Sequence, residues 1–184
     1  MKKFLFAFLV GSVSMLATTK KISAQIFSKA KVFEASENFV KIDKLMSALN
    51  KTADLDDINI KALRNFKRSY KNANDVKWTK SKHLFTATFV SDGIQTTIYY
   101  DVKGRWLGSL KNYKEEKFDS QVRAIVKSSY YDYKIDYVKE IETVGNYGSP
   151  TYLVFIEDDT NFKVVRVGDG IVDVYEQFEK QENF

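Results

Sequence analysis

The sequence contains no cysteine, one proline and one histidine among its 184 residues. The absence of cysteine excludes disulfide bonds, thiol catalysis, cysteine-ligated zinc and the lipidated cysteine of a bacterial lipoprotein. With His83 as the only histidine, a cluster of histidine metal ligands is excluded as well. The chain does contain 44% apolar and 15% aromatic residues, which is typical of a folded chain with a substantial core rather than a disordered one.

The chain begins with an apolar stretch that is too short for a permanent membrane span. Phe4 to Ala17 has 14 residues, whereas a bilayer requires about 20. Lys2 and Lys3 precede the stretch, and the small residues Ser23 and Ala24 follow it, which is the order of a secretory signal peptide. We therefore predict that residues 1–24 are a signal peptide cut after Ala24, and that the mature chain is periplasmic or secreted with no membrane anchor.

Removal of the signal peptide nearly cancels the net charge of +5. The signal carries Lys2, Lys3, Lys20 and Lys21 and no acidic residue, so 25 basic residues remain against 24 acidic ones, a net charge of +1. The basic balance therefore belongs to the precursor, and we expect no nucleic-acid partner.

The mature chain shows helical and then strand periodicity. Phe39, Ile42, Leu45, Met46 and Leu49 predict a helix over 37–50, within an N-terminal extension over 25–55. A second helix carries Ile60, Leu63, Phe66 and Tyr70 on one face, with Asp56 or Asp57 as its cap. Its other face carries Lys61, Arg64, Arg68 and Lys71, which we interpret as a solvated face, with binding of an anionic partner as the alternative.

Alternation with a period of two follows this helix and indicates four strands. The alternating residues are Val76 and Trp78, then Phe85, Ala87 and Phe89, then Thr96, Ile98 and Tyr100, then a short fourth strand at Trp106. Asp92-Gly93 and Lys103-Gly104 stand where hairpin turns are expected.

The same order occurs a second time. A helix is predicted over 119–130, with Val122, Ile125 and Val126 on its apolar face. The strand residues after it are Ile135 and Tyr137, then Tyr152, Val154 and Ile156, then Lys163, Val165 and Val167, then 171–177 after a turn at Asp169-Gly170. The first hairpin of this half is longer, around Gly145–Gly148. We predict an α+β fold, a tandem repeat of a helix plus a four-stranded antiparallel sheet over 56–113 and 114–184, joined into one sheet of eight strands with an uncovered face.

Several stretches resemble a known family. NFKRSYKNANDVKW, FTATF and IYYDVKG, followed by KSSYYDY, YLVFIE and VGDG, look like the secreted PepSY-like proteins that are grouped with beta-lactamase-inhibitor proteins. The resemblance covers 59–178 and implies export, tandem helix-plus-four-strand repeats and, for the inhibitor relatives, protein binding across a concave open sheet. Phe118-Asp119 replaces the usual Leu-Pro, and the cysteine pairs of the classical inhibitors are missing, so the resemblance implies the fold rather than inhibition.

The sequence shows no recognisable catalytic or metal-binding set. His83 has Lys82 and Leu84 as neighbours, which supply neither a nucleophile nor a carboxylate. The acidic run 157–161 lacks the glycine and distal glutamate of a calcium loop, and Gly168-Asp169-Gly170 leads into a strand rather than a helix, so we predict turns at both places. We expect no enzyme activity, no cofactor and no metal; an enzyme that uses Glu140 and Asp136 is the remaining alternative.

The uncovered face of the predicted sheet, called here the open face, is the candidate binding surface. Alternation places on it Thr86, Thr88, Gln95, Thr97, Tyr99, Leu153, Phe155, Arg166 and Tyr175. Aromatic and arginine side chains are enriched at interface hot spots, so Tyr99, Phe155, Arg166 and Tyr175 are the candidate contacts with a protein partner. The alternative is that residues 25–50 or a second copy of the chain cover this face.

The leading hypothesis is a non-enzymatic secreted binding module that binds, and in one version inhibits, an extracytoplasmic protein through the open face. The alternative is a periplasmic protein that binds a small ligand or lipid in a closed apolar cavity.

Overall fold

The computed structural model describes Lys41 and residues 52–180. The predicted signal peptide lies outside these residues, as does the predicted helix over 37–50 except for Lys41. The first half contains a 3-10 turn, a helix and four strands: η1 Leu55–Asp57, α2 Ile60–Ser69, β1 Lys77–Lys80, β2 Leu84–Ser91, β3 Ile94–Asp101 and β4 Trp106–Tyr113. The second half contains η2 Glu115–Lys117, α3 Ser120–Ser129, β5 Lys134–Thr143, β6 Thr151–Glu157, β7 Asn161–Gly168 and β8 Ile171–Glu179.

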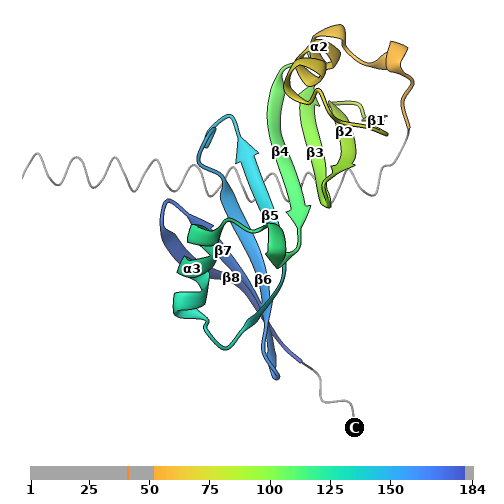
Figure 1. Cartoon of the computed structure of the whole chain (residues 1–184). Helices are drawn as coiled ribbons and strands as arrows, with labels where there is room; N and C mark the ends of the chain where they lie inside the picture. The colour runs from red at the N-terminus through yellow and green to blue at the C-terminus, as the bar shows by residue number, and fades with distance from the viewer. Residues whose placement is uncertain (1–40, 42–51, 181–184) are drawn as a thin grey trace, which may run out of the picture.

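All eight strands form a single antiparallel sheet in the order β1 to β8, so each strand pairs with its neighbours in sequence. The two halves join where β4 pairs with β5, from Gly108 opposite Thr143 to Tyr113 opposite Val138. Figure 1 shows α2 over the β1–β4 end of the sheet and α3 over the β5–β8 end. The β4–β5 pairing continues the helix-covered face of the first half into the helix-covered face of the second half. Both helices therefore cover the same face of the sheet.

Each helix begins at a side-chain cap. Asn59 Oδ1 accepts a hydrogen bond from the backbone N–H of Lys61 at 2.9 Å at the start of α2. Asp119 Oδ1 accepts from the N–H groups of Gln121 and Val122, both at 3.0 Å, at the start of α3. The prediction of Asp56 or Asp57 as the first cap was wrong, because both residues belong to η1, which ends before the helix begins.

Two cores lie between the helices and the sheet. In the first, Phe66 packs edge-on against Trp78 and Phe89, with ring centroids 5.3 and 5.7 Å away. In the second, fully buried Val126 of α3 packs within a cluster from β4–β7 and the segments on either side of α3. The predicted inward residues of β2, β3, β6 and β7 all lie in these cores: Phe85, Ala87, Phe89, Ile98, Tyr100, Val154, Ile156, Val165 and Val167. Ile125, predicted on the apolar face of α3, is instead 37% exposed.

Two of the predicted hairpin turns are confirmed by their backbone angles. Asp92 and Gly93 have φ of 53° and 75°, and Asp169 and Gly170 have 52° and 74°, which is the left-handed pair of a tight two-residue hairpin. The fourth strand was predicted to be short, but β4 has eight residues, as many as β2 and β3. The sequence of β4, WLGSLKNY, does not alternate regularly between apolar and polar residues, because the strand has a bulge opposite Tyr99 and Tyr100.

Candidate functional site

A third apolar cluster lies on the open face, opposite the helices. It contains Tyr99, Leu110, Ile141, Leu153 and Val164, each from a different strand from β3 to β7, and all are buried. Leu107, Phe155 and Tyr175 pack around it and are only partly buried. The open face therefore has an apolar centre with an aromatic rim.

The rim includes an aromatic pair that alternation did not predict. The ring of Tyr137 on β5 stacks on that of Phe155 on β6, with centroids 3.9 Å apart and planes 13° from parallel. Lys139 Nζ lies 6.0 Å from the centre of the Phe155 ring. Burial, and then the neighbouring Asp136 carboxylate, raise the pKa of the Tyr137 hydroxyl.

Tyr137 is on the open face because β5 has a bulge. Alternation grouped Tyr137 with Ile135, but the register shifts between these two residues, and Ile135 and Val138 both face the helices. The bulge turns Tyr137 to the opposite face, beside Phe155. The prediction that Ile135 and Tyr137 share a face was therefore wrong, and nothing in the local sequence marks the bulge.

Arg166 on β7 is held in place by β8. Its Nε donates to Asp173 Oδ1 at 3.1 Å and its Nη2 to Asp173 Oδ2 at 2.6 Å, a two-point contact that fixes the guanidinium plane. The guanidinium carbon lies 5.8 Å from the centre of the Tyr175 ring. Alternation could have found Asp173, because Asp173 and Tyr175 are two residues apart on one strand.

The structure places Tyr99, Phe155, Arg166 and Tyr175, the four predicted contact residues, on the open face. Tyr99, Phe155 and Tyr175 belong to the apolar cluster and its rim, and Arg166 lies against Tyr175. They differ in accessibility: Tyr99 is 1% exposed, whereas Phe155, Arg166 and Tyr175 are partly exposed. Tyr99 thus forms the floor of this surface, and the other three, with Tyr137, form its partly exposed rim.

The open face of the first half has a different chemistry. The hydroxyls of Thr79 and Thr86 form a hydrogen bond, and those of Thr88 and Thr97 form another at 3.2 Å. In these pairs, which lie along β1–β3, the threonine hydroxyls hydrogen-bond to each other. The features typical of an interface are therefore concentrated on β5–β8.

The residues considered for catalysis have structural partners. Glu140 binds Lys111 Nζ at 2.6 Å and accepts from the Tyr113 hydroxyl at 2.8 Å, on the helix side of the β4–β5 pair. Asp136 pairs with Lys114 Nζ at 2.8 Å. His83 lies exposed in the β1–β2 turn, where its backbone N–H donates to Ser81 Oγ at 3.3 Å.

The acidic run 157–161 forms a hairpin turn, as predicted. Asp158 Oδ1 accepts from the N–H groups of Thr160 and Asn161 at 2.8 and 2.6 Å. A hydrogen bond from the Tyr133 hydroxyl, followed by these backbone N–H groups, lowers the pKa of the Asp158 carboxyl well below its usual range. Within residues 52–180 we find neither a cluster of three potential metal ligands nor a helix that could span a membrane.

Comparison with known proteins relates the chain to solved structures. Neither the known protein-family models nor the curated proteins include a match. A BLIP-like (beta-lactamase-inhibitor-protein-like) structure from Bacteroides fragilis is 18% identical and covers 69% of this chain and 92% of its own, with a TM-score of 0.53. The chain has a BLIP-like fold.

Two further structures share the BLIP-like fold. A DUF2874 family protein from Bacteroides ovatus is 18% identical, with a TM-score of 0.53, and covers 69% of this chain and 89% of its own. A proposed periplasmic protein from Bacteroides eggerthii is 14% identical, with a TM-score of 0.51, and covers 66% of this chain and 88% of its own. The inhibitor-like part of the predicted resemblance is thus supported for the fold, while the PepSY-like part stays a prediction.

Proposed function

We propose that this chain is an exported, non-enzymatic binding module that holds an extracytoplasmic protein against the open face of β5–β8. The observation that carries the proposal is the partly exposed rim of Tyr137, Phe155, Arg166 and Tyr175 around a buried apolar cluster. Side chains that bury large contact areas and are already held in one conformation lose little entropy on binding.

Export rests on the signal-like order of Lys2, Lys3 and the apolar stretch to Ala17, and on the periplasmic assignment proposed for the Bacteroides eggerthii neighbour. We expect the N-terminus of the protein recovered from its native cell envelope to be Gln25. Mass spectrometry of the intact protein tests this, and recovery of the uncut chain from the cytoplasm would contradict it.

The two halves are proposed to be copies of one unit. Each consists of a three-residue 3-10 turn, a ten-residue helix and four strands in the same order. Superposing 55–113 on 115–179 tests this proposal, because true copies align strand for strand without a change of register.

The partner we expect is a folded protein that presents an aromatic or aliphatic side chain to the rim. Among the described residues, the rim offers a stacked aromatic pair beside Lys139, and an arginine whose charge Asp173 balances. Inhibition of an extracytoplasmic enzyme would then result from blocking access to it.

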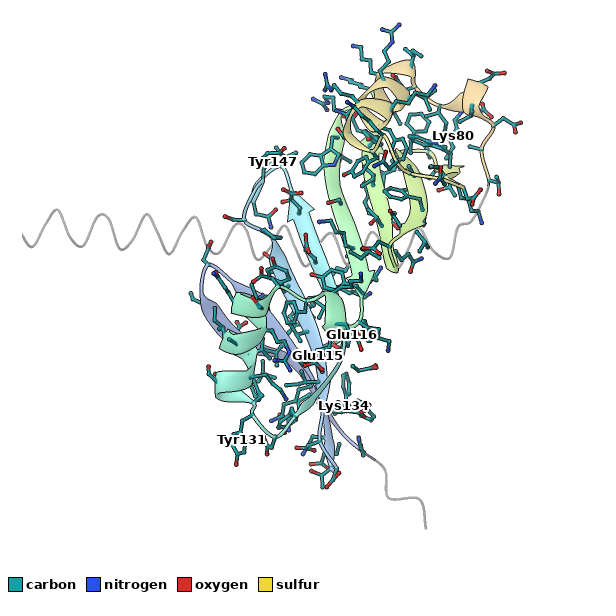
Figure 2. The ribbon with its side chains drawn as sticks, viewed as in Figure 1. Lys80, Glu115, Glu116, Tyr131, Lys134 and Tyr147 are labelled. Carbon is teal, nitrogen blue, oxygen red and sulfur yellow. The ribbon has the colours of Figure 1, made fainter. Side chains whose placement is uncertain are left out.

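The test compares three forms of the protein in affinity capture from native cell-envelope extract. Tyr137→Ser with Phe155→Ser removes the stacked pair, and Tyr131→Ser removes an aromatic ring that is 81% exposed at the end of α3, off the open face (Figure 2). A stoichiometric partner that is lost with the double variant and retained with Tyr131→Ser supports the proposal. Equal retention by all three forms contradicts it, and concentration-dependent dimers that the double variant abolishes would assign the face to a second copy.

A further inference from the structure

A second surface lies on the opposite side of the sheet, where α2 meets the β3–β4 turn. It is an open groove of about 340 Å³, called here the α2 groove, and is lined mainly by Lys61, Arg64, Asn65, Arg68, Arg105 and Trp106. Its volume falls at the lower end of the range for small-molecule sites. Because it lies on the helix side, it is separate from the rim described above.

The cations of the α2 groove are not balanced by carboxylates. Lys61, Arg64 and Arg68 lie on one side of α2, since they follow one another at intervals of three and four residues. Within residues 52–180 no carboxylate forms an ion pair with any of the three, whereas Arg105 pairs with Asp101 at 2.6 Å. Four cations therefore face one carboxylate.

Helix α3 provides an internal comparison. Its Arg123 pairs with Glu115 at 2.6 Å, and the ammonium of its Lys127 donates to the carbonyls of Tyr131, at 3.3 Å, and Tyr133. α2 has the same length and, like α3, contains no acidic residue, but none of its groove-lining cations has an ion-pair partner among residues 52–180. The unpaired charge is thus a property of α2 and not of helices in this fold, and it favours a bound anion.

The groove is rigid, because the β3–β4 turn presses against the first turn of α2. Gly104 has a φ of +76°, and a Cβ at this position would lie 2.9 Å from the backbone nitrogen of Ala62. Asn59 Nδ2 donates to the Val102 carbonyl at 3.1 Å, which ties the turn to the helix cap. The Tyr100 hydroxyl donates to Asn65 Oδ1 at 3.0 Å, so the amide N–H groups of Asn65 remain as donors.

An aromatic wall completes the groove. Trp106 is partly exposed, and the ring of Tyr147 meets it edge-on with centroids 5.7 Å apart. Tyr147 is 77% exposed at the tip of the β5–β6 hairpin, beside the end of the sheet that carries α2 (Figure 2). The β5–β6 hairpin of the second half thereby places a second aromatic ring, perpendicular to Trp106, next to the cations of the first half.

We infer that the α2 groove binds an acidic saccharide, with guanidinium groups on its carboxylate, sulfate or phosphate groups and Trp106 against a sugar ring. Guanidinium groups bind oxyanions through two parallel hydrogen bonds, and an aromatic face provides flat apolar contact. A lipid acyl chain does not fit a groove lined by four cations, and its small volume suits one or two rings rather than a protein surface.

Tryptophan fluorescence gives a direct readout, because the chain has two tryptophans and Trp78 is buried in the first core. The full-length secreted protein is titrated with a trisulfated heparin-type disaccharide, with a galacturonic acid disaccharide and with an uncharged galactose disaccharide. We expect saturable quenching with the two acidic sugars, none with the neutral one, and weaker binding as salt rises.

The variants separate the groove from general charge. Arg64→Ala with Arg68→Ala is expected to weaken binding by at least about tenfold. Lys67→Ala with Lys71→Ala removes the same charge from exposed positions that do not line the groove, and is expected to change the affinity by less than about twofold.

Three results would overturn the inference. They are equal losses in both double variants, no saturation with either acidic sugar into the millimolar range, and binding of anionic phospholipid vesicles or a glutamate-rich peptide where both sugars are inert. Thermal melting of each variant confirms that it is folded. Since the groove and the rim lie on opposite faces, Tyr137→Ser with Phe155→Ser should leave sugar binding unchanged, so the two proposals fail independently.

Discussion

Alanine substitutions at Gly104 and Gly93 should have very different costs, although the two backbones are nearly identical. Gly93 has a φ of +75° and Gly104 of +76°, so alanine at either site adopts a left-handed conformation that costs about 1 to 2 kcal/mol. A Cβ at Gly93 meets nothing within 4 Å. Gly93→Ala therefore measures the backbone cost alone.

Gly104→Ala adds a steric cost to that of the backbone. The new Cβ would lie 2.7 Å from Asn59 Oδ1, 2.9 Å from the Ala62 nitrogen and 2.9 Å from Lys61 Cβ. Two of these atoms belong to the body of α2, and Asn59 Oδ1 is fixed by the Lys61 N–H at 2.9 Å, so the turn or the helix must move. Overpacking of this kind costs about 1 to 3 kcal/mol more.

Urea unfolding, followed by tryptophan fluorescence and far-ultraviolet circular dichroism, measures both costs. We expect Gly104→Ala to be less stable than Gly93→Ala by about 1 to 3 kcal/mol, or to melt roughly 3 °C lower for each kcal/mol. Gly170→Ala, with a φ of +74° and nothing within 4 Å, is a second control and should match Gly93→Ala. Equal stability of all three variants would refute the contact between the β3–β4 turn and α2, and with it the rigidity of the α2 groove.

Three further predictions concern Asp119, Asp158 and Tyr113. Asp119→Ala should cost about 1 kcal/mol in urea unfolding through loss of the α3 cap, and Asp119→Asn should restore most of it; no loss with Ala would contradict the cap. The pKa of Asp158 is lower in the folded than in the unfolded state, so this carboxylate stabilises the fold above the unfolded value of about 3.9, and the stabilisation is lost as the pH falls below it. Asp158→Asn should therefore make the free energy of unfolding depend less on pH in the acid range. An unchanged slope would count against the hydrogen bonds of Asp158 in the 157–161 turn. Burial, and then Glu140, raise the pKa of Tyr113, so the contribution of this hydroxyl to folding stability is complete below about pH 10 and is lost as the pH rises. Absorbance titration of Tyr113→Phe should therefore lack one phenol that ionises late in the wild type. Loss of an early-ionising phenol instead would contradict the prediction.

Alternation predicted the helix-facing residues of the sheet because they are strongly apolar and the strands are regular where they lie. Phe85, Ala87 and Phe89 share one face of β2, and Val154 and Ile156 share one face of β6. The period of two decides the face of every residue in such a strand. The prediction of the central residues of both cores was therefore correct.

Alternation failed where a bulge interrupts the period. At Tyr137 and beside Trp106 the extra residue changes the face of the residues after it, and the cause is pairing with a strand that is distant in sequence. The cap of α2 was missed for a different reason: Asp56 and Asp57, which were predicted as its cap, lie within a 3-10 turn, and Asn59 after that turn caps the helix.

The α2 groove could be predicted only in part. The spacing of Lys61, Arg64 and Arg68 already showed a basic face, and the alternative of an anionic partner followed from it. Trp106 and Arg105 join that face through the β3–β4 turn, and Tyr147 arrives from a hairpin 41 residues beyond Trp106. Such long-range contacts leave no periodic signal in the sequence.

The two proposed surfaces show how one architecture can carry two different chemistries. In each half, the residues between helix and sheet are constrained by packing, so they stay apolar. The part of the open face outside its buried cluster, and the outer side of each helix, lack that constraint and can change independently. In the first half the open face has paired threonines and the helix has unbalanced cations, whereas in the second the open face has aromatic rings and the cations of the helix are paired. The groove therefore lies mainly on the first half and the rim mainly on the second, and because the two lie on opposite faces of a continuous sheet, a ligand in the α2 groove would not block the rim.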